Sequence, residues 1–406
     1  MKSVELFAGA GGLALGCALA GFKPSAVIEW DKWACDTIRE NQQNGYPLVS
    51  DWPLHEGDVR FYDWSKVPAA VDLIAGGPPC QPFSMGGKHK ADSDERDMFP
   101  ASVEVIRHLR PKAFIIENVK GLTRSRFANY YQYILLQLEF PEVVRKQRES
   151  WHEHLMRLQR EHASGKLHVH GLTYNVVPTM VNAADYNVPQ KRERVFIVGF
   201  RSDLGIRWSF PEPSCSEDAL LCDQWVTGEY WERHQVPKRK RPDCDTRLKN
   251  RVQRLKSLLI PINALPWRTV RDALFDLPEP NEVGNNVYYN HRLQKGARAY
   301  PGHTGSTLDQ PAKTLKAGDH GVPGGENMIV QESGEVRYLS VRESARLQTF
   351  PDGYRFHGSW TETMRQLGNA VPVILAQHVA SSVAEKLIAA EVDAMKLVQK
   401  HVYGVA

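Results

Sequence analysis

The first 200 residues alternate between short apolar runs and segments with helical spacing. The apolar runs are three to six residues long, and most of them are closed by Gly, Pro or an acidic residue. Such runs are typical of strands in a parallel sheet that is buried on both faces. The expected strands cover residues 4–7, 26–28, 71–75, 113–116 and 195–200.

Helical spacing occupies the intervening segments, for example residues 13–20 and 33–41. A chain that alternates strand and helix predicts an α/β fold with a mostly parallel sheet and right-handed crossovers. From about Arg201 the alternation stops, and Pro, Trp and charged residues dominate, as in V-P-K-R-K-R-P at residues 236–242. Since 406 residues are enough for two domains, a second domain or large insertion is expected to begin here.

Helical signals return near the C-terminus. Ser340 is a candidate N-cap, and Glu343, three residues later, is its expected capping-box partner. Residues 370–389 carry a longer pattern with Pro372 in the first turn, which predicts a final helix.

Composition fits a globular protein, with 42% apolar and 24% charged residues. No stretch approaches the roughly 20 apolar residues that span a bilayer, and the N-terminus lacks the apolar core of a signal peptide. A cytoplasmic protein without membrane contact is therefore expected. The net charge of +4 does not by itself indicate a nucleic-acid partner. The six cysteines form no Cys-x-x-Cys pair, and His152 and His154 do not share a helix face, so no metal site is expected.

A glycine-rich run, F-A-G-A-G-G-L-A, follows the first expected strand and opens the first helix. Its glycines let backbone amides approach an adenosyl-type ligand at a helix N-terminus. Gly9, Gly11 and Ala14 also satisfy the dinucleotide pattern, with Glu29 placed to bind ribose, so a nicotinamide enzyme is an alternative. Asp58, after a third strand region, can bind an adenine amino group or cap a turn.

Cys80 follows two prolines beyond the end of another expected strand, in the run G-G-P-P-C. Pro78 and Pro79 fix φ and hold the next side chain in one place, which favours a nucleophile over a buried structural cysteine. Glu117 ends the following strand at the same carboxyl edge, so we expect it to converge with Cys80 on one crevice. A thiolate beside a carboxylic acid suggests addition to an electrophilic ring with proton delivery.

Arg192 and Arg194 precede the strand at residues 195–200. They form either a solvated charge cluster or a pair that orients a carbonyl or phosphate group. Two late blocks complete the set of motifs, R-E-S-A-R-L-Q-T-F-P at residues 342–351 and Q-L-G-N-A-V-P at residues 366–372.

Together, and in this order, the motifs resemble those of the DNA cytosine-5 methyltransferase family of bacterial restriction-modification systems. The match is close from Met1 to about Phe200 and from Leu339 to about Val373. One departure is Glu5, where the family usually has Asp. The resemblance removes the nicotinamide alternative, because that chemistry needs no cysteine nucleophile.

The resemblance implies a Rossmann-like fold that binds S-adenosyl-L-methionine, with a smaller, irregular target-recognition domain. Residues 1–200 and 338–406 would form the catalytic and cofactor-binding domain, and residues 201–337 the target-recognition domain. In this family the C-terminal helix returns to cover the sheet near the first strand. The implied cofactor-binding residues are Phe7, Gly9, Gly11, Gly12, Leu13, Glu29, Trp30, Asp58, Val59, Pro78, Asn369 and Val371.

The implied reaction begins with a cytosine swung out of duplex DNA. Cys80 would attack C6, Glu117 would act on N3 and the exocyclic amine, Arg194 with Arg192 would hold O2 or a phosphate, and C5 would receive the methyl group. The glycines at residues 86 and 87 would hinge a loop that closes over the DNA. The implied DNA-binding residues are Gln81, Ser84, Lys238, Arg239, Thr314, Leu315 and Lys316.

The expected partner is double-stranded DNA, bound by a monomer, with a cognate restriction endonuclease as a functional counterpart that forms no stable complex with it. Two other functions are weighed against this one. A transfer-RNA cytosine-5 methyltransferase is possible because a eukaryotic branch of the family acts on RNA. A catalytically inactive DNA-binding regulator is the third, although the presence of Cys80, Glu117 and Arg194 argues against it.

Overall fold

The computed structural model describes residues 1–68, 70–79, 97–165, 171–257, 262–284, 287–301, 304–317 and 327–403. The chain divides into two compact units. Unit 1 comprises Met1–Val181, Glu193–Pro211 and Ala376–Ala406, and unit 2 comprises Asn182–Arg192 and Glu212–Leu375.

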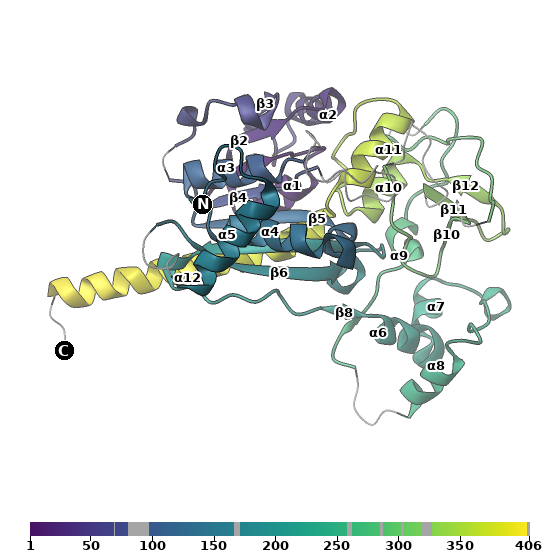
Figure 1. Cartoon of the computed structure of the whole chain (residues 1–406). Coiled ribbons are helices and arrows are strands. Elements are labelled where there is room, and N and C mark those ends of the chain that lie inside the picture. The colour runs from purple at the N-terminus through teal and green to yellow at the C-terminus, as the bar shows by residue number, and fades with distance from the viewer. Residues whose placement is uncertain are drawn as a thin grey trace. The chain divides into compact units, whose positions relative to one another are not determined.

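Unit 1 is built on a seven-stranded sheet (Figure 1). Its strands are β1 (Lys2–Leu6), β2 (Lys23–Glu29), β3 (Leu54–Glu56), β4 (Leu73–Gly76), β5 (Ala113–Val119), β6 (Tyr174–Asn182) and β7 (Glu193–Arg201). They lie in the order β3-β2-β1-β4-β5-β7-β6. The pairs from β3 to β5 are parallel, and β7 runs antiparallel to β5. The predicted α/β fold with a mostly parallel sheet is therefore confirmed.

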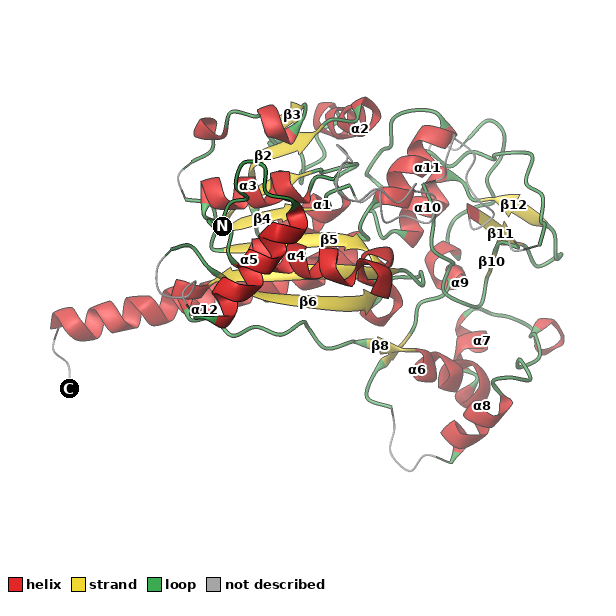
Figure 2. Cartoon of the chain, in the orientation of Figure 1, coloured by secondary structure: helices red, strands yellow, loops and turns green. Residues whose placement is uncertain are grey.

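Both faces of this sheet are buried, as the continuous apolar runs require. Val4 and Leu6 belong to the core on one face of β1. Ser3 and Glu5 alternate with them and are also buried, at 0% and 1% exposure. The helices of unit 1 are α1 (Gly12–Leu19), α2 (Lys32–Gln43), α3 (Phe99–Leu109), α4 (Ala128–Glu139), α5 (Trp151–Ala163) and most of α12 (Val373–Tyr403) (Figure 2).

The last helix returns to unit 1 beside the first helix. A Cβ atom built on Gly16 of α1 would lie 2.3 Å from the Cβ atom of Ala376, so only glycine permits this close approach. The predicted return of the final helix is confirmed. The helix begins at Val373 rather than at residue 370, because Ala370 is the C-cap of α11 (Trp360–Asn369).

One stretch among the described helices, Trp360–Lys396, is long and apolar enough to cross a membrane, with a mean hydropathy of 1.2 over its most apolar window. The sequence patterns did not predict such a stretch. A core helix passes the same test, and 44% of that window is buried. Val379, Val383 and Leu387 of α12 are at most 2% exposed. Burial of such side chains therefore accounts for part of this apolar character.

Unit 2 consists of short elements joined by long loops. They are β8 (Cys215–Ser216), α6 (Glu217–Cys222), α7 (Glu229–Arg233), α8 (Lys249–Lys256), β9 (Leu265–Pro266), α9 (Val270–Leu274), β10 (Ser306–Thr307), β11 (Met328–Val330), β12 (Val336–Tyr338), α10 (Val341–Leu347) and α11. The predicted capping box is present at the start of α10, where Ser340 Oγ accepts from the amide of Glu343 and the Glu343 side chain accepts from the amide of Ser340.

The boundary between the units differs from the predicted domain boundary. Residues 338–375 were assigned to the catalytic domain, but they belong to unit 2, and only the chain from Ala376 onward joins unit 1. The reason is a shared core, in which Leu339 and Leu347 pack with Leu315 and Ile329. Residues 182–192, predicted as catalytic domain, likewise belong to unit 2. The assignment of target recognition to the second part of the chain stays a prediction.

Candidate active site and cofactor-binding edge

Four parallel strands of unit 1 end side by side. β2, β1, β4 and β5 are neighbours in this order. The chain order reverses between β1 and β4, because β2 and β3 lie on one side of β1 while β4 and β5 lie on the other. Ligands of open α/β sheets bind beyond the carboxyl ends at such a switch point. Glu29 ends β2, Phe7 follows β1, Gly77 follows β4, and Glu117 lies near the end of β5. The fold therefore brings the predicted cofactor loop and the predicted catalytic acid to one edge.

The loop after β1 has an unusual backbone. Phe7, Gly9 and Gly11 all have positive φ values, of 53°, 54° and 87°. Left-handed geometry is costly for a phenylalanine and easy for a glycine. Gly11 is also the N-cap of α1 and provides no side-chain cap, so Gly12 and Leu13 open the helix with amides that no capping side chain bonds. A helix start of this kind can receive polar groups of a ligand.

Glu29 fixes this loop to the end of β2. Its buried carboxylate accepts hydrogen bonds from the amides of Gly9 at 2.6 Å, Trp30 at 2.8 Å and Asp31 at 2.7 Å. Burial raises the pKa of Glu29, and these three hydrogen bonds oppose the rise. Sequence reasoning assigned Glu29 to ribose only and missed its bond to Gly9, although the spacing of 20 residues between them was visible. The carboxylate therefore holds the loop in shape.

Asp58 begins the turn Val59–Phe61, and Val59 is 3% exposed. The carboxylate accepts from the amide of Arg60 at 2.9 Å and pairs with its guanidinium group at 2.5 Å. The hydrogen bonds from Arg60 lower the pKa of Asp58 and keep it ionised. Asp58 therefore caps a turn, which was one of its two expected roles. Its anionic carboxylate is also compatible with the other role, which is to accept from an adenine amino group.

These residues fit an adenosyl group. No atom lies within 4 Å of a Cβ built on Gly9, so there is room beside the loop. Trp30 follows Glu29 and is 70% exposed, and an exposed aromatic residue suits a purine. Asn369 is exposed at the end of α11 and Val371 is 5% exposed, but both lie in unit 2, and their contact with the cofactor stays a prediction.

Glu117 and Arg194 form a nearly buried ion pair in unit 1. Arg194 Nε lies 2.9 Å from Glu117 Oε1, with 11% and 8% of the two side chains exposed. The register of β5 against β7 explains the contact: Glu117 is opposite Phe196, and Arg194 is two residues away on the same face. Burial lowers the pKa of Arg194, and the Glu117 carboxylate opposes that fall. β5 runs on to Val119, so Glu117 lies two residues before the end of the strand rather than at its end as predicted.

The segment that leads to Cys80 is held by the residue after Glu117. Asn118 Nδ2 donates to the carbonyl oxygen of Pro78 at 3.0 Å, and Asn118 Oδ1 accepts from the amide of Val119 at 2.8 Å. Pro78 is buried. The sequence patterns assigned no separate role to Asn118. Its position next to Glu117 was the one feature that pointed to a role in the site. Cys80, Gln81, Ser84 and the predicted glycine hinge lie outside the described residues.

Arg192 requires a correction. Its side chain has no exposed surface, and its guanidinium group donates to the carbonyl oxygens of Leu315 at 3.0 Å, Gly368 at 2.6 Å and Ala370 at 2.9 Å. A guanidinium held in this way does not act as the predicted partner of Arg194 on a cytosine or a phosphate. The two arginines separate because Arg194 is inside β7, whereas Arg192 precedes the strand and belongs to unit 2.

Some of the predicted DNA-binding residues of unit 2 are buried and others are exposed. The side chain of Leu315 is 1% exposed and belongs to a core, and the predicted contact of this residue with DNA stays a prediction. Thr314 is half-buried and donates to the carbonyl oxygen of Lys191 at 2.7 Å. The side chains that remain exposed are Lys238, Arg239 and Lys316.

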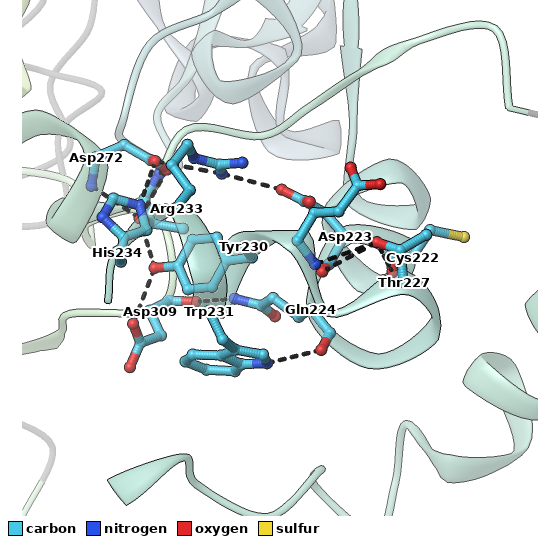
Figure 3. A network of polar contacts seen from close by, with 12 residues as sticks. Cys222, Asp223, Gln224, Thr227, Tyr230, Trp231, Arg233, His234, Asp272 and Asp309 are labelled. Carbon is cyan, nitrogen blue, oxygen red and sulfur yellow. Dashed lines mark hydrogen bonds and ion pairs between the residues drawn. The ribbon is translucent and has the colours of Figure 1, made fainter. Parts of the chain in front are cut away.

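A polar network holds Asp309, which precedes Thr314 and Lys316 in the chain (Figure 3). The Tyr230 hydroxyl lies 2.8 Å from Asp309 Oδ1 and 2.9 Å from Thr269 Oγ1. Gln224 donates to the carbonyl oxygen of Asp309 at 2.7 Å, and Arg271 Nε donates to its carboxylate at 2.7 Å. Asp309 is therefore fixed five residues before Thr314.

The fold and the edge of unit 1 define an enzyme of the S-adenosylmethionine-dependent methyltransferase class. The sequence model of the family described as C-5 cytosine-specific DNA methylase matches residues 1–141 and 156–385. The chain belongs to this family. It is a DNA cytosine-5 methyltransferase that uses S-adenosyl-L-methionine.

Bacterial relatives match nearly the whole chain. The Type II methyltransferase M.PspPI of Psychrobacter sp. (strain TA137) is 32% identical over 397 residues, which cover 96% of this chain and 80% of the relative. The Type II methyltransferase M.NgoMIV of Neisseria gonorrhoeae is 31% identical over 395 residues, which cover 95% and 97%.

Two solved structures share the fold. A putative DNA modification methyltransferase encoded within an E. coli prophage gives a TM-score of 0.56 at 21% identity, over 96% of this chain and 99% of that one. The Dnmt2 methyltransferase of S. pombe gives a TM-score of 0.54 at 17% identity, over 95% and 99%. At these identities the likeness concerns the fold alone.

Proposed function

We propose that this protein is a site-specific, Type II DNA methyltransferase that acts in the cytoplasm and protects DNA against a cognate restriction endonuclease. The names of M.PspPI and M.NgoMIV, which are Type II methyltransferases, support this assignment. We further propose that it acts as a monomer on duplex DNA and forms no stable complex with the endonuclease.

The observation that carries the mechanism is the arrangement at the ends of β4 and β5. The carboxylate of Glu117 is paired with Arg194, and the neighbouring Asn118 holds the carbonyl group of Pro78, two residues before Cys80. Adjacent residues of one strand thereby fix the Glu117 carboxyl group and the backbone of Pro78, from which the chain leads to Cys80. This is the arrangement that addition to an electrophilic ring requires.

In the proposed reaction, the thiolate of Cys80 adds to C6 of the cytosine and forms a C6–S bond. Glu117 hydrogen-bonds or protonates N3, so that the electron density released by the addition collects at C5. C5 then takes the methyl group. Loss of the C5 proton to water and departure of the Cys80 thiolate restore the aromatic ring. The cysteine is regenerated, and any proton that Glu117 gave to N3 returns to Glu117, so that the C5 proton is the one released.

Ion pairing of Glu117 with Arg194 serves two purposes in this scheme. It orients the carboxyl group toward the ring, and it places a cation in the crevice that favours the thiolate over a thiol of pKa about 8.5. Arg194 is also the remaining candidate to hold O2 of the base. The target must leave the duplex to reach these groups, at a cost of a few kcal/mol.

The bound cofactor supplies the methyl group from its sulfonium centre. The residues that would hold it are those of the loop after β1, with Glu29 toward the ribose, Asp58 toward the adenine amino group and Trp30 against the purine ring. Their common task is to bind and orient the cofactor. Lys238, Arg239 and Lys316 would contact DNA from unit 2, where lysine and arginine position the duplex through its phosphates.

The test is transfer of a labelled methyl group to duplex DNA by the wild type and by Cys80→Ser, with 5-fluorocytosine DNA as a covalent trap. We expect transfer and a trapped adduct with the wild type and neither with the variant. Sequencing the methylated product gives the target site, and digestion of methylated DNA with bacterial lysates tests protection against an endonuclease.

Other outcomes separate the alternatives. Transfer to transfer RNA but not to duplex DNA would replace the proposal with an RNA methyltransferase. DNA binding without transfer to either substrate would favour an inactive regulator. Transfer by Cys80→Ser at the wild-type rate would refute the covalent mechanism.

A further inference from the structure

Three segments of unit 2 that are far apart in the sequence meet at Arg192. The first is Arg192 with its neighbours Gln190 and Lys191. The second is the segment that carries the proposed DNA contact Lys316, and we call residues 312–317 the recognition segment. The third is the turn at the end of α11, residues 368–371, which contains the proposed cofactor contacts Asn369 and Val371 and is called the cofactor turn.

The recognition segment lies along the first of these segments. The amide of Lys191 donates to the carbonyl oxygen of Ala312 at 2.8 Å. The amide of Ala312 donates to the carbonyl oxygen of Pro189 at 2.9 Å. Gln190, which has no exposed surface, accepts from the amide of Leu315 at 3.1 Å. The backbone of the recognition segment is therefore fixed relative to Arg192.

Arg192 then joins this segment to the cofactor turn. One terminal nitrogen of its guanidinium group donates to Leu315 O at 3.0 Å. The other donates to Gly368 O at 2.6 Å and to Ala370 O at 2.9 Å. The carbonyl groups at a helix C-terminus lack donors from their own helix, and a cation there is favourable. Because the guanidinium group is planar and rigid, a shift of one carbonyl is transmitted to the donors of the others.

Close backbone packing completes the connection. A Cβ atom built on Gly368 would lie 2.2 Å from the amide nitrogen of Ala317 and 2.4 Å from the carbonyl carbon of Lys316. Real Cβ atoms do not approach backbone so closely, so Gly368 lets the recognition segment rest directly on the end of α11. The contact is between the backbone of Gly368 and the backbone of Lys316 and Ala317.

We propose that Arg192 is a positioning residue that couples cofactor binding to DNA recognition. This inference rests on the proposed function, because it takes Asn369 and Val371 as cofactor contacts and the recognition segment as a DNA contact. Cofactor bound at the turn fixes the carbonyl groups of Gly368 and Ala370, Arg192 carries this order to Leu315, and the adjacent Lys316 is held where it meets DNA. By thermodynamic reciprocity, DNA strengthens cofactor binding by the same factor.

Unit 2 offers a matched control in Arg342. This arginine is also fully buried, and it donates to the carbonyl oxygens of Tyr289 at 3.0 Å, Pro351 at 3.1 Å and Tyr354. None of these three groups belongs to the recognition segment or the cofactor turn. Replacement of either arginine removes the same kinds of bonds from a buried site, but only Arg192 joins the two segments.

The experiment measures the dissociation constant of the target duplex with and without S-adenosyl-L-homocysteine, the product form of the cofactor. For the wild type we expect the product to tighten DNA binding about 5- to 150-fold, the usual range for coupled sites. Arg192→Lys should reduce this ratio at least fivefold. Arg342→Lys should lower the melting temperature to a similar extent and leave the ratio unchanged. A wild-type ratio in Arg192→Lys, or an equal loss in both variants, would overturn the proposal.

A second measurement on the wild type does not depend on the folding of a variant. Amide hydrogen exchange at Leu315 and Lys316 should slow when S-adenosyl-L-homocysteine binds in the absence of DNA. Unchanged exchange there, with slowed exchange in α1, would contradict the coupling. A wild type that binds product and methylates DNA but shows no coupling would overturn this inference alone, whereas one that does neither would overturn the proposed function.

Discussion

Glu5 provides a sharp test of how burial controls this fold. The residue lies in the middle of β1, two residues before Phe7, and is 1% exposed. Ser3 Oγ donates to Glu5 Oε1 at 2.7 Å, which compensates only part of the cost of burying a carboxylate. Burial therefore raises the pKa of Glu5 from 4.5 to about 7. Burial and the nearby charge of Glu5 also raise the pKa of Cys17.

The magnitude follows from the pKa. One pKa unit corresponds to about 1.4 kcal/mol, so the rise to about 7 corresponds to roughly 3 kcal/mol between the two protonation states. Because the folded-state pKa of Glu5 lies above the unfolded one, its contribution to stability is fully present below about pH 4.5. It is lost as the pH rises to about 7, where the folded protein must ionise the buried carboxyl group.

The perturbation is Glu5→Gln, which keeps the shape and the acceptor for Ser3 but cannot ionise. The assay is the free energy of unfolding from denaturant titrations between pH 5 and pH 8.5. Relative to the variant, the free energy of unfolding of the wild type should fall by about 2 to 3 kcal/mol across this range. This is less than the full difference, because part of the change takes place below pH 5. Glu104→Gln, at an exposed position of α3, is the control and should show no such trend. A difference between wild type and Glu5→Gln that is independent of pH would refute the reasoning.

Three further predictions concern the site. Glu117→Gln should lower kcat for methyl transfer about 100-fold or more while DNA binding in gel shifts is retained, and activity within tenfold of the wild type would count against Glu117 as the acid. Asn118→Ala removes the donor to Pro78 and should lower the free energy of unfolding by about 1 kcal/mol in thermal unfolding. Because the catalytic segment is then held less firmly, kcat should also fall roughly tenfold. An unchanged kcat would contradict the positioning role of Asn118. Tyr230→Phe loses the bond to Asp309 and should cost about 1 to 2 kcal/mol. It should also raise methylation at sites that differ by one base pair relative to the target, measured by competition between the two duplexes, and an unchanged preference would leave the network with a purely structural role.

Local patterns in the sequence were sufficient for much of unit 1. Short, mostly apolar runs marked β1, β2, β4, β5 and β7, because strands buried on both faces carry few polar residues. The capping box at Ser340 and Glu343 was visible because it is formed by residues three positions apart. The order of the motifs was enough for the family, which the family model then matched.

The tertiary structure decided what the same motifs do. Arg192 and Arg194 are equivalent in the sequence, yet one binds carbonyl groups 123 to 178 residues away and the other pairs with Glu117. Leu315 was expected to contact DNA, and the fold places its side chain in a core of unit 2 that it shares with Leu339 and Leu347. Periodicity and spacing report on neighbours along the chain, whereas the partner of a buried polar group depends on which distant backbone groups the fold leaves without a hydrogen bond.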